Sequence, residues 1–399
     1  MKIAVVVRIL WSAGTQKFAI EQAKALSAFG HNIDLIFIRR GKNGKVYDDL
    51  LKEVNYRVLY ESNQSMFVPL FDFITGIFMT NRKSDGRVDY NLIKHFPSVA
   101  KNRYDLIICQ DQWAGLAGYY TNRKFGTPYF VIIHERINEM PWVKGTKRVL
   151  AFLALIYQRK VLMGARRVLT ETKRVAHTVE DFYSRYNLKV VSDFPGIISK
   201  EFVPFSEKSD TIVLVSYWNE VKFPELYFHI FSKIADFKFI MIGNWISEAY
   251  RKKYMEKLAE YNLTSRVTLI SGLSEDEKNN IIAGSKFYLR FGQGEYGPGY
   301  GSIEALQLGV PLIVNRDLGI VDEIEGYKVG FVVDDPKDAD KILGFIKEYN
   351  NEESYSDLQD NIRQFNSDHS WKRHCEILLE GWSKPYKEDE DTWENPAFR

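Results

Sequence analysis

The sequence predicts an α/β protein in which two doubly wound parallel sheets follow one another along the chain. Three observations predict this fold class: short apolar strands rich in β-branched residues, helical stretches between them, and one break in this alternation near the middle. Strands that are apolar throughout are typical of parallel sheets, because helices bury both faces of such a sheet. Strands that alternate with helices indicate βαβ units.

The first half opens with a strand expected over residues 2–9 and a helix expected over 15–29. Apolar residues in the second stretch recur at helical spacing, and Gly30 directly after it suits a helix C-terminal cap. Further strands are expected at residues 33–38, 104–109, 128–134 and 166–171. Helical stretches lie between these strands, so the first half predicts one parallel sheet.

Residues 192–210 interrupt the alternation with prolines, a glycine and small polar residues, and we expect a linker there. Ser274 and Glu277 stand at capping-box spacing and predict the start of a helix in the second half. Strands in this half are expected at residues 211–217, 237–243, 267–271, 286–291, 311–315 and 330–334. The rhythm of the first half therefore restarts after the linker.

The predicted architecture is two tandem Rossmann-like domains, one over residues 1–200 and one over 201–370. Residues 371–399 are expected to form a helix that packs back toward the N-terminal domain, followed by an acidic tail. A chain of 399 residues exceeds what one hydrophobic core usually organises, which also favours two domains.

Composition narrows the class of protein. The 54 Lys and Arg nearly balance the 52 Asp and Glu, so we expect no nucleic-acid partner. Cys109 and Cys375 stand outside any metal or redox motif and suit a reducing compartment. The apolar start is too short for a signal peptide, and no run reaches the roughly 18 apolar residues that span a bilayer. We expect a cytoplasmic protein, and the histidine spacings predict no metal site.

The stretch GEYGPGYGSIEALQLGVPLIVN (294–315) is the strongest candidate for a binding site. It follows an expected strand and leads into a helix expected to start near Gly301. Helix N-termini at the carboxyl ends of parallel strands attract anions. Gly297 and Gly299 let backbone amides approach a phosphate or a sugar closely. Glu304, one turn inside the helix, is placed to accept hydrogen bonds from ribose hydroxyls.

This stretch resembles the donor-binding signature of the GT-B glycosyltransferases, specifically the retaining glycosyltransferase family 4 (glycosyl transferases group 1). Glu304, Ala305, Gly309 and Pro311 match the family pattern position for position. Other pieces of the chain fall in the order of the family: MKIAVVV, AFGHNIDLIFI, YDLIICQDQW, the strand that ends in His134, PGI and VTLISGLSEDE.

The resemblance implies two domains that face each other across a cleft. It also implies transfer of a sugar from a UDP- or GDP-sugar to a glycan or lipid-linked acceptor, with retention at the anomeric carbon. Basic side chains and helix dipoles would stabilise the leaving diphosphate, so we expect no metal cofactor.

The resemblance further implies roles for individual residues. His134 and Glu295 would act on the reacting sugar. Lys222 would hold the diphosphate, Glu304 the ribose, and the loop amides the phosphates and the sugar. The residues implied to bind the donor are Gly14, Thr15, Lys222, Gly297, Gly299, Tyr300, Gly301, Ser302 and Glu304, and we add Arg290 from its place in the sequence.

The sequence departs from the family pattern at two points. Tyr217 stands where the family has an arginine, and Arg290 is our candidate for a replacement cation because it lies near the glycine-rich loop in sequence. Glu295 and Glu304 are separated by one residue more than the two glutamates of the family. We interpret this as one extra loop residue, with Glu295 keeping the role of the first glutamate.

Other interpretations remain open for these residues. Glu304 would also complement the dipole of its helix, Glu295 would also suit a solvated loop, and Lys222 would also suit an exposed surface. His134 would also suit a structural position at the end of a strand.

A catalytically impaired GT-B homologue that serves as a scaffold or partner subunit is the alternative function. A nicotinamide-dependent oxidoreductase is a further one, although RILWSAGTQK replaces GxGxxG after the first strand.

Residues 142–160 combine an apolar helix with basic residues on both sides and Trp142. One interpretation is peripheral contact with an anionic membrane at its cytoplasmic face. The other is a helix that faces the core with solvated ends. Membrane contact would favour a lipid-linked acceptor. Residues 67–79 are also strongly apolar but too short to span a bilayer.

Overall fold

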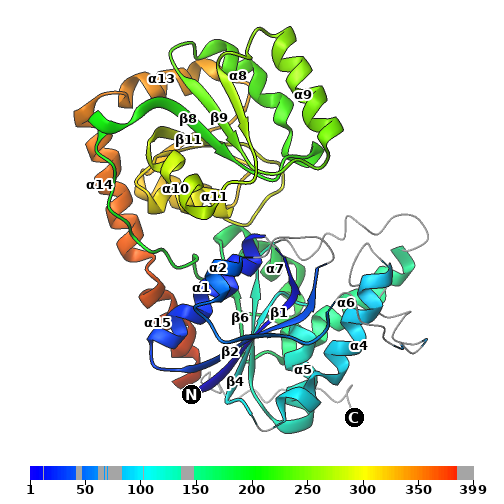
Figure 1. The fold of residues 1–399 in the computed structure, drawn as a ribbon. Helices are drawn as coiled ribbons and strands as arrows, with labels where there is room; N and C mark the ends of the chain where they lie inside the picture. Colours follow the sequence, from blue (N-terminus) through cyan, green and yellow to red (C-terminus); the bar gives the residue numbers. More distant parts are fainter. Residues whose placement is uncertain are drawn as a thin grey trace.

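The computed structural model describes residues 1–11, 13–41, 47–61, 67, 70, 83–101, 103–135 and 148–383. These residues form two parallel sheets with helices on both faces, one above the other in Figure 1. The fold confirms the predicted α/β class with two Rossmann-like domains. The predicted acidic tail after residue 383, residues 142–147 and nearly all of residues 67–79 lie outside the described part of the chain.

The first sheet has the strand order β3-β2-β1-β4-β5-β6-β7, and all its neighbours pair in parallel. Its strands are β1 (Lys2–Leu10), β2 (Asn32–Arg40), β3 (Tyr56–Val58), β4 (Leu106–Gln110), β5 (Tyr129–Ile133), β6 (Arg167–Thr170) and β7 (Val191–Ser192). Its helices are α1 (Gly14–Ala28), α2 (Asp48–Leu51), α4 (Lys83–Ala100), α5 (Gly115–Phe125), α6 (Arg148–Gly164) and α7 (Lys173–Phe182).

The second sheet has the order β10-β9-β8-β11-β12-β13, again parallel throughout. Its strands are β8 (Ser209–Val215), β9 (Lys238–Ile242), β10 (Val267–Ile270), β11 (Ser285–Arg290), β12 (Leu312–Asn315) and β13 (Gly330–Val333). The helices of this half are α8 (Tyr227–Lys233), α9 (Glu248–Glu260), α10 (Glu275–Ala283), α11 (Tyr300–Gln307), α12 (Val321–Tyr327), α13 (Ala339–Tyr349) and α14 (Glu352–Asp368), and the chain continues into α15 (Trp371–Ser383).

The strands are apolar throughout because each sheet is buried on both faces. In β1, Ala4 and Val6 join the core beneath α4–α7, whereas Val5 and Val7 join the core beneath α1 and α15. Burying a side chain of this size contributes about 1.5–3 kcal/mol. This two-sided burial is the physical reason that the sequence pattern predicts the strands well.

Two local signals also take their expected form. Gly30 follows α1 with a φ of 85°, the left-handed conformation that closes a helix. Ser274 and Glu277 form a complete capping box at the start of α10.

The chain crosses between the two halves twice. It passes from β7 to β8 through residues 193–208, and it returns where α14 ends and α15 begins, beside α1 (Figure 1). The two crossings touch, because the Ile197 amide donates to the His369 carbonyl at 2.7 Å. Gly196 makes room for this contact, since a Cβ there would lie 2.2 Å from Cδ2 of Trp371.

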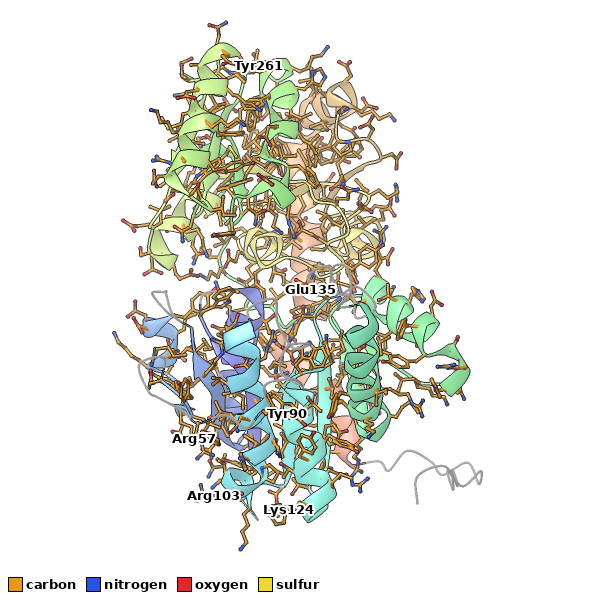
Figure 2. The ribbon with its side chains drawn as sticks, turned by 90° about the vertical axis from the view of Figure 1, so that its right-hand side faces the viewer. Arg57, Tyr90, Arg103, Lys124, Glu135 and Tyr261 are labelled. Atoms are coloured by element: carbon orange, nitrogen blue, oxygen red, sulfur yellow. The ribbon has the colours of Figure 1, made fainter. Side chains whose placement is uncertain are left out.

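Glu135 marks the level at which the two domains meet (Figure 2). It follows His134, the first residue after β5. Within the described ranges, no helix has the length and apolar character needed to cross a bilayer.

Candidate active site

The carboxyl ends of strands from both sheets meet where the domains touch. Gly297 packs against the first domain so closely that a Cβ there would lie 2.7 Å from the carbonyl oxygen of His134. Next to it, the Thr172 hydroxyl donates to the Tyr296 carbonyl at 2.6 Å. Ligands of doubly wound folds bind at these strand ends, which makes this contact region the candidate site.

Tyr300, the first residue of α11, contacts both domains. Its ring packs against core residues of both domains and lies next to Gly14, where a Cβ would be 3.0 Å from Cδ2 of Tyr300. Its buried hydroxyl has no hydrogen-bond partner among the described residues. The start of α1 and the start of α11 are therefore in direct contact, with Thr15 in the first turn of α1.

Arg290 lies across the glycine-rich loop. Its guanidinium passes Gly299 so closely that a Cβ there would overlap Nη1, at 1.4 Å, and Gly299 has a φ of 73°. Nη1 donates to the Pro298 carbonyl at 3.1 Å. Only glycine suits this position, because a side chain would displace the arginine and strain the backbone.

Glu295 joins two cations. Its Oε2 atom lies 2.5 Å from Nζ of Lys222 and 2.6 Å from Nη2 of Arg290. Burial raises the pKa of Glu295, but the charges of Arg290 and Lys222 outweigh burial and hold the pKa below its usual value. The group therefore carries two positive charges and one negative charge beside the N-terminus of α11.

A second charged cluster surrounds Glu304 on α11. Its Oε1 atom accepts from Nζ of Lys17 at 2.5 Å and from Nζ of Lys278 at 2.9 Å, and both lysines also contact Glu275. Burial lowers the pKa of Lys17, but the two glutamates outweigh burial and raise the pKa above its usual value. Because Lys17 belongs to α1 and the other three residues to α10 and α11, the cluster joins the two domains.

His134 is buried between two polar partners. Its Nδ1 atom lies 2.9 Å from Oε1 of Glu171, and its Nε2 atom lies 3.0 Å from Oε1 of Gln110. Burial lowers the pKa of His134, but the charge of Glu171, helped by Asp111 and Glu135, outweighs burial and raises it. Both ring nitrogens face residues of the first domain, and the neighbouring carboxylates favour the charged form of the ring.

The structure places the predicted residues in two groups. Lys222, Arg290 and Glu295 meet at one carboxylate oxygen, while Gly14, Tyr300 and Glu304 lie where α1 meets α11, together with Gly301 and Ser302 in the first turn of α11. Tyr217, in place of the arginine of the family, is about half exposed.

Sequence reasoning missed four charged residues of the site: Lys17, Glu171, Glu275 and Lys278. Glu275 and Lys278 stand three apart in a helix that the capping box announces, a signal that predicts an ion pair. No sequence signal pairs Lys17 with Glu304, because 287 positions separate them.

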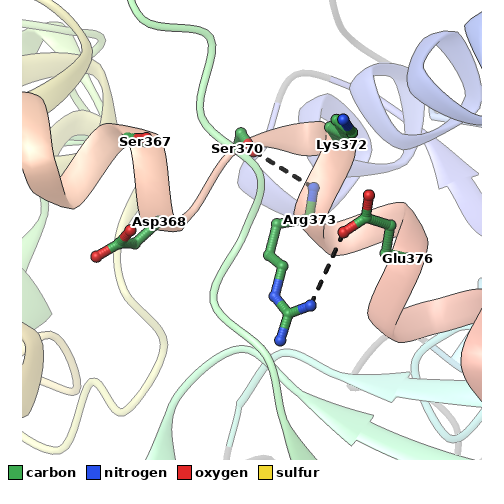
Figure 3. Close-up of a pocket in the computed structure, with 6 residues that line it drawn as sticks. All are labelled: Ser367, Asp368, Ser370, Lys372, Arg373 and Glu376. Carbon is green, nitrogen blue, oxygen red and sulfur yellow. Dashed lines mark hydrogen bonds and ion pairs between the residues drawn. The ribbon is translucent and has the colours of Figure 1, made fainter.

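Two further features bear on ligand binding. Among the residues that the structure describes, no group of three His, Cys, Asp or Glu side chains is placed to hold a metal ion. A polar surface pocket of about 380 Å³ lies where α14 gives way to α15, lined by residues such as Asp368 and Arg373 (Figure 3). It is open to solvent and lined by none of the predicted site residues.

Two family models match the chain. Residues 13–192 match the glycosyl transferase 4-like domain, and residues 197–365 match the glycosyl transferases group 1 domain. The chain is therefore a GT-B glycosyltransferase of group 1. No curated protein matches its sequence.

Solved structures share the whole fold. Anabaena HepE in complex with UDP is 14% identical, with a TM-score of 0.73 over 96% of this chain and 100% of that one. A glycosyltransferase from Rickettsia africae is 17% identical, with a TM-score of 0.69 over 96% and 99%. Sucrose-phosphate synthase from Thermosynechococcus elongatus is 16% identical, with a TM-score of 0.67 over 96% and 98%. At these identities the likeness establishes the fold alone.

Proposed function

We propose that the protein is a retaining, metal-independent glycosyltransferase of family 4 that moves a sugar from a UDP- or GDP-sugar to a glycan or lipid-linked acceptor. The observation that carries the proposal is the meeting of Lys222 and Arg290 at Glu295, beside the glycine-rich loop. Two cations at a helix N-terminus suit a leaving diphosphate.

Lys222 and Arg290 bind the diphosphate of the donor. Glu295 pairs with both cations and offsets one of their two charges, so the diphosphate displaces this carboxylate when it binds. The backbone amides of Gly297 and of Gly299 to Gly301 complete the phosphate site. Glu295, released from the cations, then turns toward the sugar. Arg290 supplies the charge that the family takes from an arginine at the position of Tyr217.

Glu304 binds the ribose through the oxygen that the lysines leave open. Both lysine contacts fall on Oε1, and Oε2 is the atom that we assign to the ribose hydroxyls. Lys17 fixes the orientation of this carboxylate from the opposite domain. Gly14 and Thr15 close over the donor from the same side.

His134 contributes its positive charge to the site. Because Glu171 and Gln110 occupy both ring nitrogens, His134 acts on the departing diphosphate through its charge and not through a direct hydrogen bond. In the retaining reaction, the acceptor oxygen forms a bond to the anomeric carbon on the face from which the diphosphate leaves. The bond between that carbon and the phosphate oxygen breaks, and the leaving phosphate takes the acceptor proton.

A scaffold role without turnover is not favoured. Two departures from the family pattern support it, the missing arginine and the extra residue between Glu295 and Glu304, but Arg290 reaches the same carboxylate as Lys222. Membrane contact through residues 142–160 stays a prediction, as does the lipid-linked acceptor.

The first test is donor binding and turnover. UDP and GDP sugars are offered to the protein, its melting temperature is recorded, and release of the nucleoside diphosphate is measured. UDP-glucose is the first donor to try, because a HepE structure holds it. We expect one donor to raise the melting temperature and to release its diphosphate without added metal.

Lys222→Ala should abolish that shift, and Lys253→Ala on the exposed face of α9 should keep it. No shift with any UDP or GDP sugar would contradict the proposal. An inverted configuration at the anomeric carbon of the product, read by NMR, would contradict retention.

A further inference from the structure

Six buried polar side chains form a continuous line through the first domain. The line begins at Glu171, whose Oε1 atom lies 2.9 Å from Nδ1 of His134, and continues to Gln110, whose Oε1 atom lies 3.0 Å from Nε2 of the same ring. Gln110 and Gln22 are fully buried, and the Nε2 atom of Gln110 donates to Oε1 of Gln22 at 2.7 Å.

The line reaches His374 on α15 and ends at Asp193, directly after β7. Nε2 of Gln22 lies 2.8 Å from Nε2 of His374 on α15, and Nδ1 of His374 lies 2.7 Å from Oδ2 of Asp193. Each end is thus a carboxylate beside a histidine, and the two histidines are joined by two amides. Phe18 holds both rings by edge contacts, with ring centroids 5.3 Å from His134 and 5.4 Å from His374.

The two amides limit where protons can lie. An amide side chain has a donor end and an acceptor end, and Gln110 and Gln22 meet donor to acceptor. When Gln110 presents its oxygen to His134, Gln22 must present its nitrogen to His374. The first ring then needs a proton on Nε2, and the second ring needs a bare Nε2. If both amides rotate by 180°, His134 needs the bare Nε2 and His374 needs the protonated one.

The other two arrangements leave buried groups unpaired. Protons on Nε2 of both rings would turn the amide nitrogens of Gln110 and Gln22 toward each other. Bare Nε2 atoms on both rings would turn the two amide oxygens toward each other. Neither arrangement satisfies its buried polar atoms, and leaving them unsatisfied is costly. In both rings Nδ1 lies within ion-pair distance of a carboxylate oxygen, an acceptor that suits a proton on Nδ1.

We propose that His134 and His374 share a single Nε2 proton through the Gln110–Gln22 pair, so that only one of the two rings is positively charged at a time. His374 is then a positioning residue for the charge of His134. Exchange between the two states releases one proton from one Nε2 to solvent and takes one up at the other, without net change.

The charged groups around each ring favour charge on His134 in the state described. Glu171, Asp111 and Glu135 all raise the pKa of His134, against the lowering effect of burial. At ion-pair distance each ring faces one carboxylate, Glu171 for His134 and Asp193 for His374. The amide orientations also favour the Nε2 proton on His134, because Gln110 presents its oxygen to that ring.

The shared proton links the site to the segment that joins the two domains. α15 follows α14 at the second crossing, where Trp371 packs on Gly196. A shift of α15 that separates His374 from Gln22 would free the amides to turn and would release the constraint on His134. That the charge of His134 serves sugar transfer rests on the proposed function, whereas the shared proton does not.

NMR of the histidine ring nitrogens in the full chain tests the proposal directly. The chain has seven histidines, and single His→Gln variants assign their signals. At neutral pH we expect His134 to carry protons on both nitrogens and His374 to carry one on Nδ1 alone. Two doubly protonated rings, or two rings with bare Nε2 atoms, would overturn the proposal. This measurement needs no turnover.

Substitutions of Gln22 provide the second arm. A carboxylate accepts hydrogen bonds on both sides, so Gln22→Glu should allow both rings to be doubly protonated at neutral pH. Gln22→Met, of similar length but without hydrogen bonds, should let each ring titrate without affecting the other. If Gln22→Glu leaves His374 singly protonated, the coupling is absent.

The pH dependence of turnover is a further measurement, and a purely structural role of Gln22 would leave it unchanged. Once a donor is known, Gln22→Glu should shift the pH dependence of kcat while the KM for the donor stays the same. Ring signals as expected without turnover in any variant would contradict the proposed function and leave the shared proton intact. Turnover with a pH profile unchanged by Gln22→Glu would contradict the positioning role.

Discussion

Nζ of Lys17 lies 2.5 Å from Oε1 of Glu304, and this contact holds the start of α1 against α11 of the other domain. Both side chains are nearly buried, and Glu275 and Lys278 complete two ion pairs around them. Buried charges without partners are strongly destabilising, so the four groups are balanced only while the domains stay together.

Lys17→Met should therefore weaken the contact between the domains. It removes one cation and leaves Lys278 to serve two glutamates, so we expect a loss of roughly 1–3 kcal/mol, the cost of a buried charged group that loses a hydrogen bond. The melting temperature and protease resistance of the linker at residues 193–208 measure the loss. The exposed Lys253→Met is the control, expected to change little. Equal melting curves for the two variants would contradict the role of Lys17.

Glu295 should make the protein sensitive to acid. Since its two cations lower its pKa in the folded state, its stabilising contribution is complete above the ordinary value of about 4.3 and is lost as pH falls through the lower folded pKa. Glu295→Gln should lose less stability than the native protein between about pH 5 and pH 3. Urea unfolding across this range measures the difference, with Glu256→Gln on exposed α9 as the control. If all three proteins lost the same unfolding free energy over this pH range, Glu295 would not contribute to the acid sensitivity.

Glu323 should behave in the opposite sense. Burial raises its pKa to about 7, so the folded protein holds a proton that the unfolded chain releases near pH 4.5. The folded protein therefore tolerates this group better at low pH, where the carboxyl is neutral. Stability decreases as pH rises through 7 and the buried carboxyl ionises. Glu323→Gln should therefore stabilise the protein by roughly 1–3 kcal/mol at pH 8 and much less at pH 5. Equal effects at both pH values, measured by urea unfolding, would refute the assignment.

Gly299→Ala should disable the donor site while the domains stay folded. The added Cβ would collide with Nη1 of Arg290 and move the guanidinium away from Pro298 and Glu295. Loss of one charge-assisted hydrogen bond, about 1.5–3 kcal/mol, should weaken binding of the nucleoside diphosphate by roughly tenfold or more.

Gly344→Ala is the matched control for that variant. A Cβ at Gly344 meets no atom within 4 Å, and the position lies inside α13. This substitution should keep binding and raise stability by up to about 1 kcal/mol. Calorimetric titration with UDP or GDP gives both affinities. Undiminished binding by Gly299→Ala would show that Arg290 does not contact the phosphates.

The sequence predicts the strands and helices of this protein better than the pairing of its charged side chains. Strands such as β1 and β8 are buried on both faces, and such burial leaves a continuous apolar signal in the chain. Gly30 and the Ser274 capping box are equally local. Such features depend on neighbours a few residues away, so one sequence suffices.

Side-chain pairs between residues distant in the sequence leave no comparable pattern in it. Arg290 could be suggested as a cation because it precedes the glycine-rich loop, but its meeting with Lys222 depends on how β8 and β11 lie side by side. The contact of Lys17 with Glu304 depends on how two domains dock, and the buried line from His134 to His374 depends on the return of α15. Folding alone brings these groups together.

Glu295 competes with any incoming anion for Lys222 and Arg290. An anion that enters must replace a carboxylate that is held at high effective concentration by its own loop, so weakly charged ions such as chloride or bicarbonate meet a filled position. A diphosphate brings more negative charge than the single carboxylate and can engage both cations at once. If Lys222 and Arg290 bind the donor as proposed, the loop would set a threshold of charge that small anions do not reach.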